Sequence, residues 1–258
     1  MGSDDQGGTA ETGEASELLR RLVAQAKRVV AFTGAGISTE CGVPDFRSPG
    51  SPWLAHPPVA YADFVASPNT RVVAWQRKFA MDDLYAGAVP GRGHRALARL
   101  VAMGKVSGII TQNIDGLHMA SGVPPEKIIE LHGNGTFAVC LSCANRHELA
   151  DIRPRFEANG EAPACKCGGM VKSATVSFGQ PMPREPMRRA QILAESCDLF
   201  LAIGSSLVVQ PAASFPALAR RNGARLVILN RDPTPLDPLA DMCLRGDIGS
   251  LLAPLLAE

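Results

Sequence analysis

The fold is decided by the stretch Val29-Val30-Ala31-Phe32-Thr33-Gly34-Ala35-Gly36-Ile37-Ser38. Its apolar run predicts a buried strand, the two glycines predict a turn, and the residues after them predict a helix. Gly34 and Gly36 would let the backbone turn tightly and approach a pyrophosphate, which the N–H groups of that helix would face. The dinucleotide-binding fingerprint has a third glycine where this chain has Thr39. No strand that ends in an acidic residue follows at the distance expected for a contact to the ribose. An ordinary hydride-transferring dinucleotide enzyme is therefore disfavoured.

Composition limits the class of protein. The 258 residues, 46% of them hydrophobic, suit one large domain with a smaller one inserted. A net charge of +1 gives no global field that attracts nucleic acid or anionic membrane, so neither is expected as a partner. No apolar run reaches the roughly 20 residues that span a bilayer, and the N-terminus has no signal-peptide pattern. We expect a cytoplasmic globular protein with a disordered tail over residues 1–14; the oligomeric state stays open.

Strand and helix patterns alternate along the rest of the chain. A helix capped by Ser16 should lead into the first strand, a loop should span residues 48–58, and a helical insertion over residues 61–85 should break at Ser67-Pro68. Alternating strands and helices are typical of an α/β fold with a doubly wound parallel sheet. The further strands are expected at residues 106–111, 128–131, 175–178, 199–203 and 226–229, with helices at 93–103, 187–195 and 212–221 and from 249 on.

Four of the seven cysteines form a metal-binding pattern. Two residues separate Cys140 from Cys143, one separates Cys165 from Cys167, and 21 lie between the pairs. Two such closely spaced cysteine pairs, called knuckles, build tetrahedral zinc sites. Four thiolates leave no coordination position open for catalysis. We therefore expect one structural Zn²⁺. Because the second knuckle is one residue short, a decayed site or one that recruits His147 is the alternative.

The segments beyond the glycine turn resemble the sirtuins, the NAD-dependent protein deacylases. The resemblance rests on Glu40-Cys41-Gly42-Val43-Pro44-Asp45-Phe46-Arg47-Ser48, on Thr111-Gln112-Asn113-Ile114-Asp115-Gly116-Leu117-His118, on Leu131-His132-Gly133, and on residues 176–179, 204–209, 229–230 and 246–248. These blocks occur in the family's order over roughly residues 16 to 255. The resemblance implies a Rossmann-like NAD-binding domain over residues 15–53, 87–134 and 175–258. The inserted small domain would comprise a helical module over residues 54–86 and the zinc module over residues 135–174.

The resemblance also implies the site residues. His132 would be the general base, whereas a histidine without this resemblance would be interpreted as a hydrogen-bonded core residue. Asn113 and Asp115 would hold the nicotinamide and its ribose. His118 matches no role and is expected to be structural. NAD contacts are implied for Gly34, Ala35, Gly36, Asp45, Phe46, Arg47, Gln112, Asn113, Asp115, His132, Gly204, Ser205, Ser206, Asn230, Asp247 and Ile248, and peptide contacts for Val176, Phe178, Gly179 and Val208.

The family's reaction explains why these residue types are needed. Cleavage of the nicotinamide–ribose bond lets the weakly nucleophilic amide oxygen of an acyl-lysine attack, so positioning matters most. His132 would then accept a proton from a ribose hydroxyl, and nicotinamide, O-acyl-ADP-ribose and free lysine would result. A protein mono-ADP-ribosyltransferase and a non-catalytic NAD or ADP-ribose binding module are the alternatives. The module would not need Asn113, Asp115 and His132 together.

The helical insertion suggests which acyl groups are accepted. It resembles the class II branch of the sirtuins, whose acid-accepting members carry a Tyr and an Arg where this chain has Ala74 and Arg77. Without the Tyr, we expect acetyl and longer neutral acyl chains to be preferred over succinyl, with Arg77 on a solvated helix face or in an ion pair. Gln180 replaces a Glu that many sirtuins carry after Phe-Gly, which is expected to relax any preference for basic residues near the target lysine.

Overall fold

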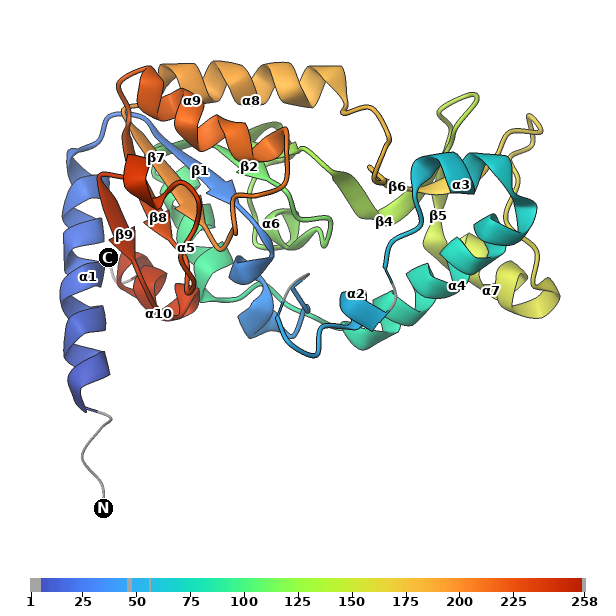
Figure 1. The fold of residues 1–258 in the computed structure, drawn as a ribbon, viewed down its shortest axis with the longest axis horizontal. Coiled ribbons are helices and arrows are strands. Elements are labelled where there is room, and N and C mark those ends of the chain that lie inside the picture. Colours follow the sequence, from blue (N-terminus) through green and yellow to red (C-terminus); the bar gives the residue numbers. More distant parts are fainter. Residues whose placement is uncertain (1–5, 46–47, 56, 257–258) are drawn as a thin grey trace.

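A computed structural model describes residues 6–45, 48–55 and 57–256. Within this part of the chain, six parallel strands form a sheet in the order β3-β2-β1-β7-β8-β9 (Figure 1). This corresponds to the 3-2-1-4-5-6 order of the Rossmann fold, so the predicted doubly wound sheet is confirmed. Strand β9 lies outside the predicted strands. The strands are β1 (Val29–Thr33), β2 (Val106–Thr111), β3 (Ile128–Glu130), β7 (Leu199–Ile203), β8 (Arg225–Leu229) and β9 (Met242–Leu244).

Helices cover both faces of this sheet because its central strands are apolar on both sides. In β1, Val29 and Ala31 pack in one core cluster with α1 (Gln6–Gln25), α5 (Arg92–Ala102) and α10 (Ile248–Leu252). Val30 and Phe32 point to the opposite face, where they pack in a second cluster with α8 (Arg184–Ser196) and α9 (Phe215–Arg221). Figure 1 shows α8 and α9 on one side of the sheet, and α1 and α10 on the other.

The N-terminal helix differs from its prediction. Helix α1 begins at Gln6, so the disordered tail expected over residues 1–14 is wrong for residues 6–14; residues 1–5 lie outside the described residues. Ser16 is buried inside this helix and does not cap it. The reason is cooperativity: once Leu19 and Val23 anchor a helix on the sheet, extending it costs much less than starting one.

A second, antiparallel sheet carries the small domain. Its strands lie in the order β5-β4-β6, with bounds β4 (Gly133–Cys140), β5 (Arg146–Glu148) and β6 (Val171–Thr175). Helices α3 (Tyr61–Ala66), α4 (Pro68–Leu84) and α7 (Leu149–Asn159) lie beside it, at the far end from α1 (Figure 1). Trp75 and Phe79 of α4 pack in one buried cluster with Phe156 of α7. The helical and zinc segments thus share a core, while the domain boundaries stay predictions.

Several short elements complete the fold. The predicted break between two helices is confirmed, because Ser67 caps α4 by accepting a hydrogen bond from the N–H of Thr70 at 3.2 Å. The predicted loop over residues 48–58 contains helix α2 (Pro52–Ala55), and the predicted strand 175–178 is wrong beyond Thr175, where β6 ends. The remaining short helices are η1 (Ala35–Ile37), η2 (Thr39–Cys41), α6 (Leu117–Ala120), η3 (Pro125–Lys127), η4 (Ala212–Ser214), η5 (Asp237–Leu239) and η6 (Ala253–Leu256).

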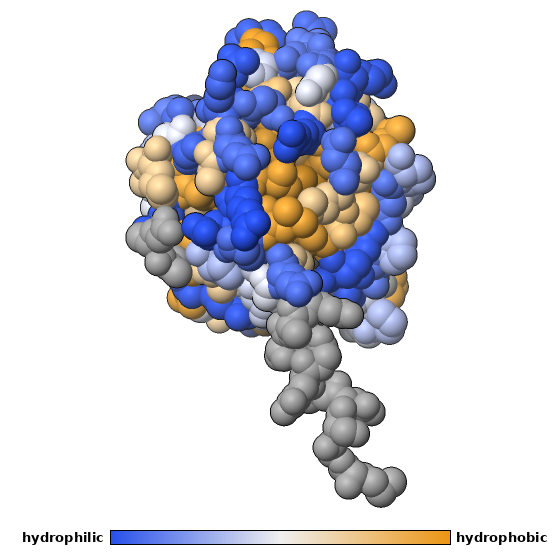
Figure 2. All heavy atoms as spheres, turned by 90° about the vertical axis from the view of Figure 1, so that its left-hand side faces the viewer, coloured by the Kyte–Doolittle hydropathy of each residue, from blue (hydrophilic) through white to orange (hydrophobic). Residues whose placement is uncertain are grey.

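The surface on the α1 side is mostly hydrophilic. Figure 2 shows polar residues around a smaller apolar area in the middle of this face. None of the helices in the described residues is both long and apolar enough to cross a membrane.

Candidate active site

The candidate site lies where the strand order reverses, between β1 and β7. The turns after these two strands are bonded to each other: the N–H of Gly34 donates to the carbonyl of Ile203 at 3.0 Å, and the N–H of Gly36 to that of Gly204 at 2.8 Å. A Cβ at Gly36 would lie 2.7 Å from the Cα of Gly204. The glycines are therefore needed so that the two turns can touch. The predicted helix after the turn is wrong, since only the single 3₁₀ turns η1 and η2 follow.

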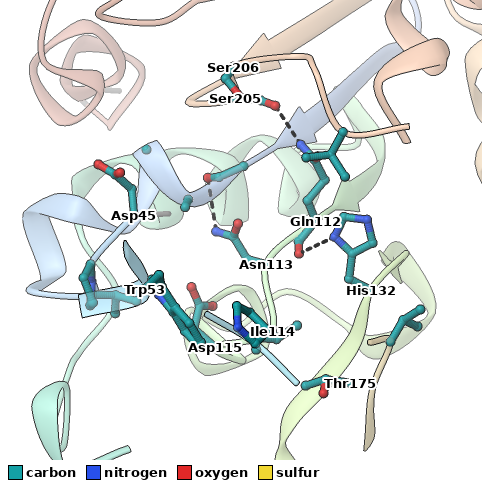
Figure 3. A pocket seen from close by; sticks show the side chains of 18 of the residues that line it. Asp45, Trp53, Gln112, Asn113, Ile114, Asp115, His132, Thr175, Ser205 and Ser206 are labelled. Carbon is teal, nitrogen blue, oxygen red and sulfur yellow. Dashed lines mark hydrogen bonds between the residues drawn. The ribbon is translucent and has the colours of Figure 1, made fainter. Parts of the chain in front are cut away.

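A cavity of about 1110 Å³ opens at this point (Figure 3). It extends into the small domain, where Phe64 and Trp75 line it. It slightly exceeds the range of about 300–1,000 Å³ that is usual for drug-sized ligands. Val208 does not line it, although Val209 does, and Phe46 and Arg47 lie outside the described residues. All the other predicted NAD and peptide residues line it: Gly34, Ala35, Gly36, Asp45, Gln112, Asn113, Asp115, His132, Val176, Phe178, Gly179, Gly204, Ser205, Ser206, Asn230, Asp247 and Ile248.

Asn113 and Asp115 are joined by Ser38, a residue without a predicted role. The Ser38 hydroxyl donates to Oδ2 of Asp115 at 2.7 Å and accepts from Nδ2 of Asn113 at 3.1 Å. Asn113 also donates to the carbonyl of Gly34 at 3.2 Å, as Figure 3 shows. Both side chains thus have fixed orientations at the end of β2. The only sequence signal for Ser38 is its place directly behind the glycine turn.

His132 follows β3 and is held by the backbone of the neighbouring strand end. Its Nδ1 lies 3.0 Å from the carbonyl oxygen of Gln112 (Figure 3). A carbonyl can only accept, so Nδ1 carries the hydrogen and Nε2 of the neutral ring is left as a base. Burial lowers the pKa of His132, and the Gln112 carbonyl opposes this shift only in part. The imidazole is therefore neutral at neutral pH, so its Nε2 can accept a proton.

The opposite wall of the cavity comes from the ends of β7 and β8 and from the start of α10. Gln112 reaches it, since its Nε2 donates to the hydroxyl of Ser205 at 2.7 Å. Asn230 donates to the carbonyl of Asp232 at 2.8 Å, and Asp247 caps α10 by accepting from the N–H of Ser250 at 2.7 Å. These polar side chains are thus anchored by hydrogen bonds within the protein.

His118 is a core residue, as expected. It is buried, and its Nε2 lies 2.9 Å from the hydroxyl of Thr33. Burial lowers its pKa to about 3, and the neighbouring His94 adds to this shift. His118 is therefore uncharged, and it does not line the cavity.

The two predicted peptide-binding segments are not strands in the described structure. Phe178 and Val208 are 60% and 44% exposed, which leaves apolar surface on both. Some backbone groups of the segment over residues 176–179, however, already form hydrogen bonds within the protein. The N–H of Val176 donates to the carbonyl of His132 at 2.7 Å, and the N–H of Tyr61 donates to the carbonyl of Phe178 at 2.9 Å.

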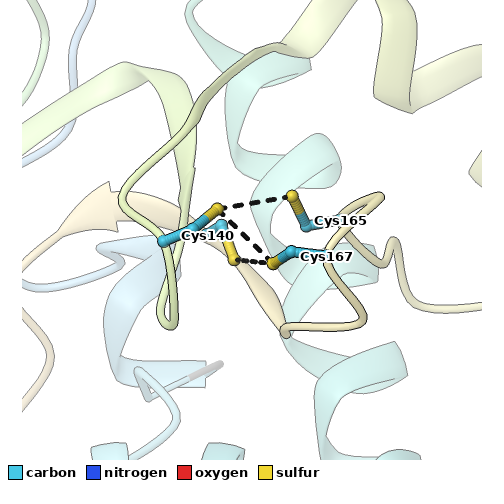
Figure 4. A group of neighbouring side chains, drawn as sticks. Cys140, Cys165 and Cys167 are labelled. Atoms are coloured by element: carbon cyan, nitrogen blue, oxygen red, sulfur yellow. Dashed lines mark hydrogen bonds between the residues drawn. The ribbon is translucent and has the colours of Figure 1, made fainter.

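The four knuckle cysteines converge on one point (Figure 4). Their Sγ atoms all lie within 4.8 Å of one another, and those of Cys140 and Cys167 are 3.5 Å apart. Zinc–sulfur bonds of about 2.3 Å in a tetrahedron place sulfur atoms about 3.8 Å apart, so this geometry fits zinc. His147 does not belong to the group. The shortened knuckle therefore still brings Cys165 and Cys167 into a four-thiolate site for one structural zinc ion.

Comparison with known proteins identifies the family. Residues 34–211 match the model of the Sir2 family. The chain belongs to the Sir2 family. A curated relative, the NAD-dependent protein deacetylase 1 of Bradyrhizobium diazoefficiens, is 56% identical over 243 residues, which cover 94% of this chain and 95% of that protein.

Solved Sir2-family structures share the whole fold. A Sir2 structure with p53 peptide and NAD⁺ has a TM-score of 0.82 at 32% identity and covers 93% of this chain and 97% of that one. Sir2Af2 bound to a myristoylated histone peptide has a TM-score of 0.75 at 35% identity, with 96% and 95% covered. This Sir2-family chain is accordingly an NAD-dependent protein deacylase, with NAD and structural zinc as its cofactors.

Proposed function

We propose that this site removes acetyl and longer neutral acyl groups from lysine side chains of a protein or peptide. The products would be nicotinamide, O-acyl-ADP-ribose and free lysine. One observation carries the proposal: Asn113, Asp115 and His132 line the same cavity as the glycine turn, and this cavity continues into the small domain. A binding module would need the glycine turn but not these three side chains together.

The proposed roles follow from the anchored geometry. When bound, NAD would supply an electrophilic ribose carbon for the acyl-lysine amide oxygen, with nicotinamide as the leaving group. Asn113 and Asp115 hold the reacting end in place, since Ser38 fixes both side chains. His132 accepts a proton from a ribose hydroxyl at its free Nε2, while the Gln112 carbonyl holds Nδ1–H. The remaining NAD contacts, including those of Phe46 and Arg47, are proposed on family resemblance.

Asn113→Ala and Asp115→Ala are expected to slow nicotinamide release by about a hundredfold, because a misplacement of about 1 Å can cost that much. Single-turnover release with an acetyl-lysine peptide measures it. Asn222→Ala is the matched control, because Asn222 is exposed and its side chain donates to the carbonyl of Leu218 in α9, the helix that it caps. Release at the wild-type rate in both site variants would place the reacting end of NAD elsewhere.

The peptide is proposed to lie between Val176, Phe178 and Gly179 on one side and Val208 on the other. Backbone addition of an extended peptide supplies affinity with little sequence preference. The exposed side chains of Phe178 and Val208 offer apolar contacts at the two rims. Gln180 adds no negative charge there, which supports tolerance of varied residues around the target lysine.

The acyl chain is proposed to enter the part of the cavity inside the small domain. Phe64, Trp75 and Met81 line it and are buried apolar side chains, which favours a neutral chain. Arg77 also lines the cavity, so it is not simply on a solvated helix face. Its guanidinium donates to the carbonyl of Pro57 at 2.6 Å, which already occupies part of its donor capacity.

A panel of acetyl, longer neutral and succinyl forms of one peptide tests both activity and preference. With NAD, we expect nicotinamide release and deacylated peptide, with the neutral forms turned over most efficiently. A buried acidic tail loses about 1–3 kcal/mol for each unmet hydrogen bond, so succinyl should be roughly tenfold worse or more. Mass spectrometry of all products separates the alternatives. ADP-ribosylated protein would indicate a transferase, and a succinyl preference that disappears in Arg77→Met would contradict the neutral pocket.

A further inference from the structure

A single peptide group beside His132 is held at both ends. Its carbonyl belongs to Thr175 and accepts a hydrogen bond from Nζ of Lys172 at 2.6 Å. Its N–H belongs to Val176 and donates to the carbonyl of His132 at 2.7 Å. Thr175 ends β6, and His132 directly precedes β4, the strand that pairs with β6. Figure 3 shows both residues among those that line the cavity. Lys172 is therefore linked to the backbone of His132 through one peptide plane.

Lys172 is an unusual residue for a protein interior. Its side chain belongs to β6 and is only 4% exposed. Both of its hydrogen bonds go to carbonyl oxygens, those of Thr175 and of Ser173 at 3.3 Å, and it forms no ion pair with any described residue. Burial lowers its pKa to about 8. Burying an ammonium without a counter-ion is costly, so this position suggests a specific task.

The backbone around His132 depends on the end of β6. Gly133 pairs with Thr175, and its φ of +71° is one that other residues rarely adopt. A Cβ on Gly133 would lie 2.1 Å from the carbonyl oxygen of Ala174, so the two strands touch there. The ladder between β4 and β6 is irregular from Gly133 to Ala138. The Val176–His132 hydrogen bond thus lies beyond the regular ladder, where the end of β6 needs separate support.

We propose that Lys172 is a positioning residue for His132, acting through the Thr175–Val176 peptide. The Lys172 ammonium makes a strong, charge-assisted hydrogen bond to the Thr175 carbonyl. This bond polarises the Thr175–Val176 peptide, which strengthens the hydrogen bond from the Val176 N–H to the His132 carbonyl. His132 is then held at two points: the Gln112 carbonyl accepts from its Nδ1, and the N–H of Val176 donates to its backbone carbonyl. This inference rests on the proposed role of His132 as general base.

The test compares Lys172→Met with wild type in steady-state deacylation. We expect kcat to fall about tenfold or more, with the KM for NAD nearly unchanged, because His132 would be misplaced while the NAD-binding wall stays intact. Lys172→Arg, which keeps the charge and the donors, should restore most of the loss. Hydrogen exchange should quicken at the Val176 N–H, and the NMR signals of the His132 ring should shift. A general loss of stability would instead quicken exchange throughout β4.

The matched control is Lys105→Met. Lys105 also donates to two carbonyls, those of Ala24 at 2.8 Å and Ala26 at 3.3 Å, but it does not line the cavity. Its variant should keep the wild-type kcat. If Lys172→Met does not fold, Lys172→Gln replaces it and is expected to show the same kcat loss. Unchanged kcat in the folded variant, or no rescue by arginine, overturns the inference. Activity in His132→Ala, measured alongside, would instead overturn the role of His132 itself.

Discussion

His132→Ala is expected to lower the turnover of an acyl-lysine peptide by about 10²–10⁴-fold, the usual contribution of a general base. The imidazole is built for this role, because the Gln112 carbonyl occupies Nδ1 and leaves Nε2 free to accept a proton. NAD binding should survive, since the turns after β1 and β7 are bonded to each other without His132. Product formation by mass spectrometry and NAD titration by calorimetry measure the two effects.

The pH dependence offers an independent check on His132. Burial holds its pKa below the ordinary value of 6.5, so the competent neutral form is present at neutral pH and is lost only as the pH falls through that lowered pKa. The acid limb of kcat/KM should therefore lie below pH 6.5. His147→Ala is the control, because His147 lies on β5 and does not line the active cavity. Near-normal deacylation in His132→Ala would rule out the general-base role.

Much of the site follows from the sequence because strand ends can be located by pattern. The apolar run over residues 106–111 predicts β2 with its observed bounds, which places Gln112, Asn113 and Asp115 at the carboxyl edge of the sheet. Parallel strands bring such ends together whatever their separation in the chain. His132 and Ser205, which follow other strands, therefore line the same cavity.

What escaped prediction depends on contacts that no local pattern encodes. Ser38 bonds Asp115 across 77 residues, and neither neighbourhood indicates the pair. The glycines of the first turn suggest a phosphate loop, whereas their closest constraint is the turn at Gly204. The run 176–178 has the alternation of a strand, yet the N–H of Val176 bonds to the His132 carbonyl and no described strand continues there. In each case, tertiary packing overrides local propensity.

Cys140→Ser is expected to cost both the zinc ion and the fold of the small domain. Structural zinc contributes about 10–16 kcal/mol in isolated zinc-finger peptides, which is comparable to the roughly 5–15 kcal/mol net stability of a whole domain. Here Cys140 and Cys165 are also members of the buried cluster that contains Trp75. Losing one thiolate therefore removes a metal bond and disturbs that core together. Elemental analysis and the melting temperature report both losses.

The same substitution should reach the active site. Cys140 pairs with Val171 where β6 begins, and β6 ends at Thr175, whose peptide with Val176 contacts His132. We therefore expect the rate of deacylation to fall together with the zinc content. The affinity for NAD should fall less, because NAD binding depends on the large sheet. Cys197→Ser is the matched control, because Cys197 is buried but lies outside the four-cysteine group. It should keep zinc and activity. A metal-free Cys140→Ser protein with an unchanged melting temperature would mean that zinc does not hold this domain together.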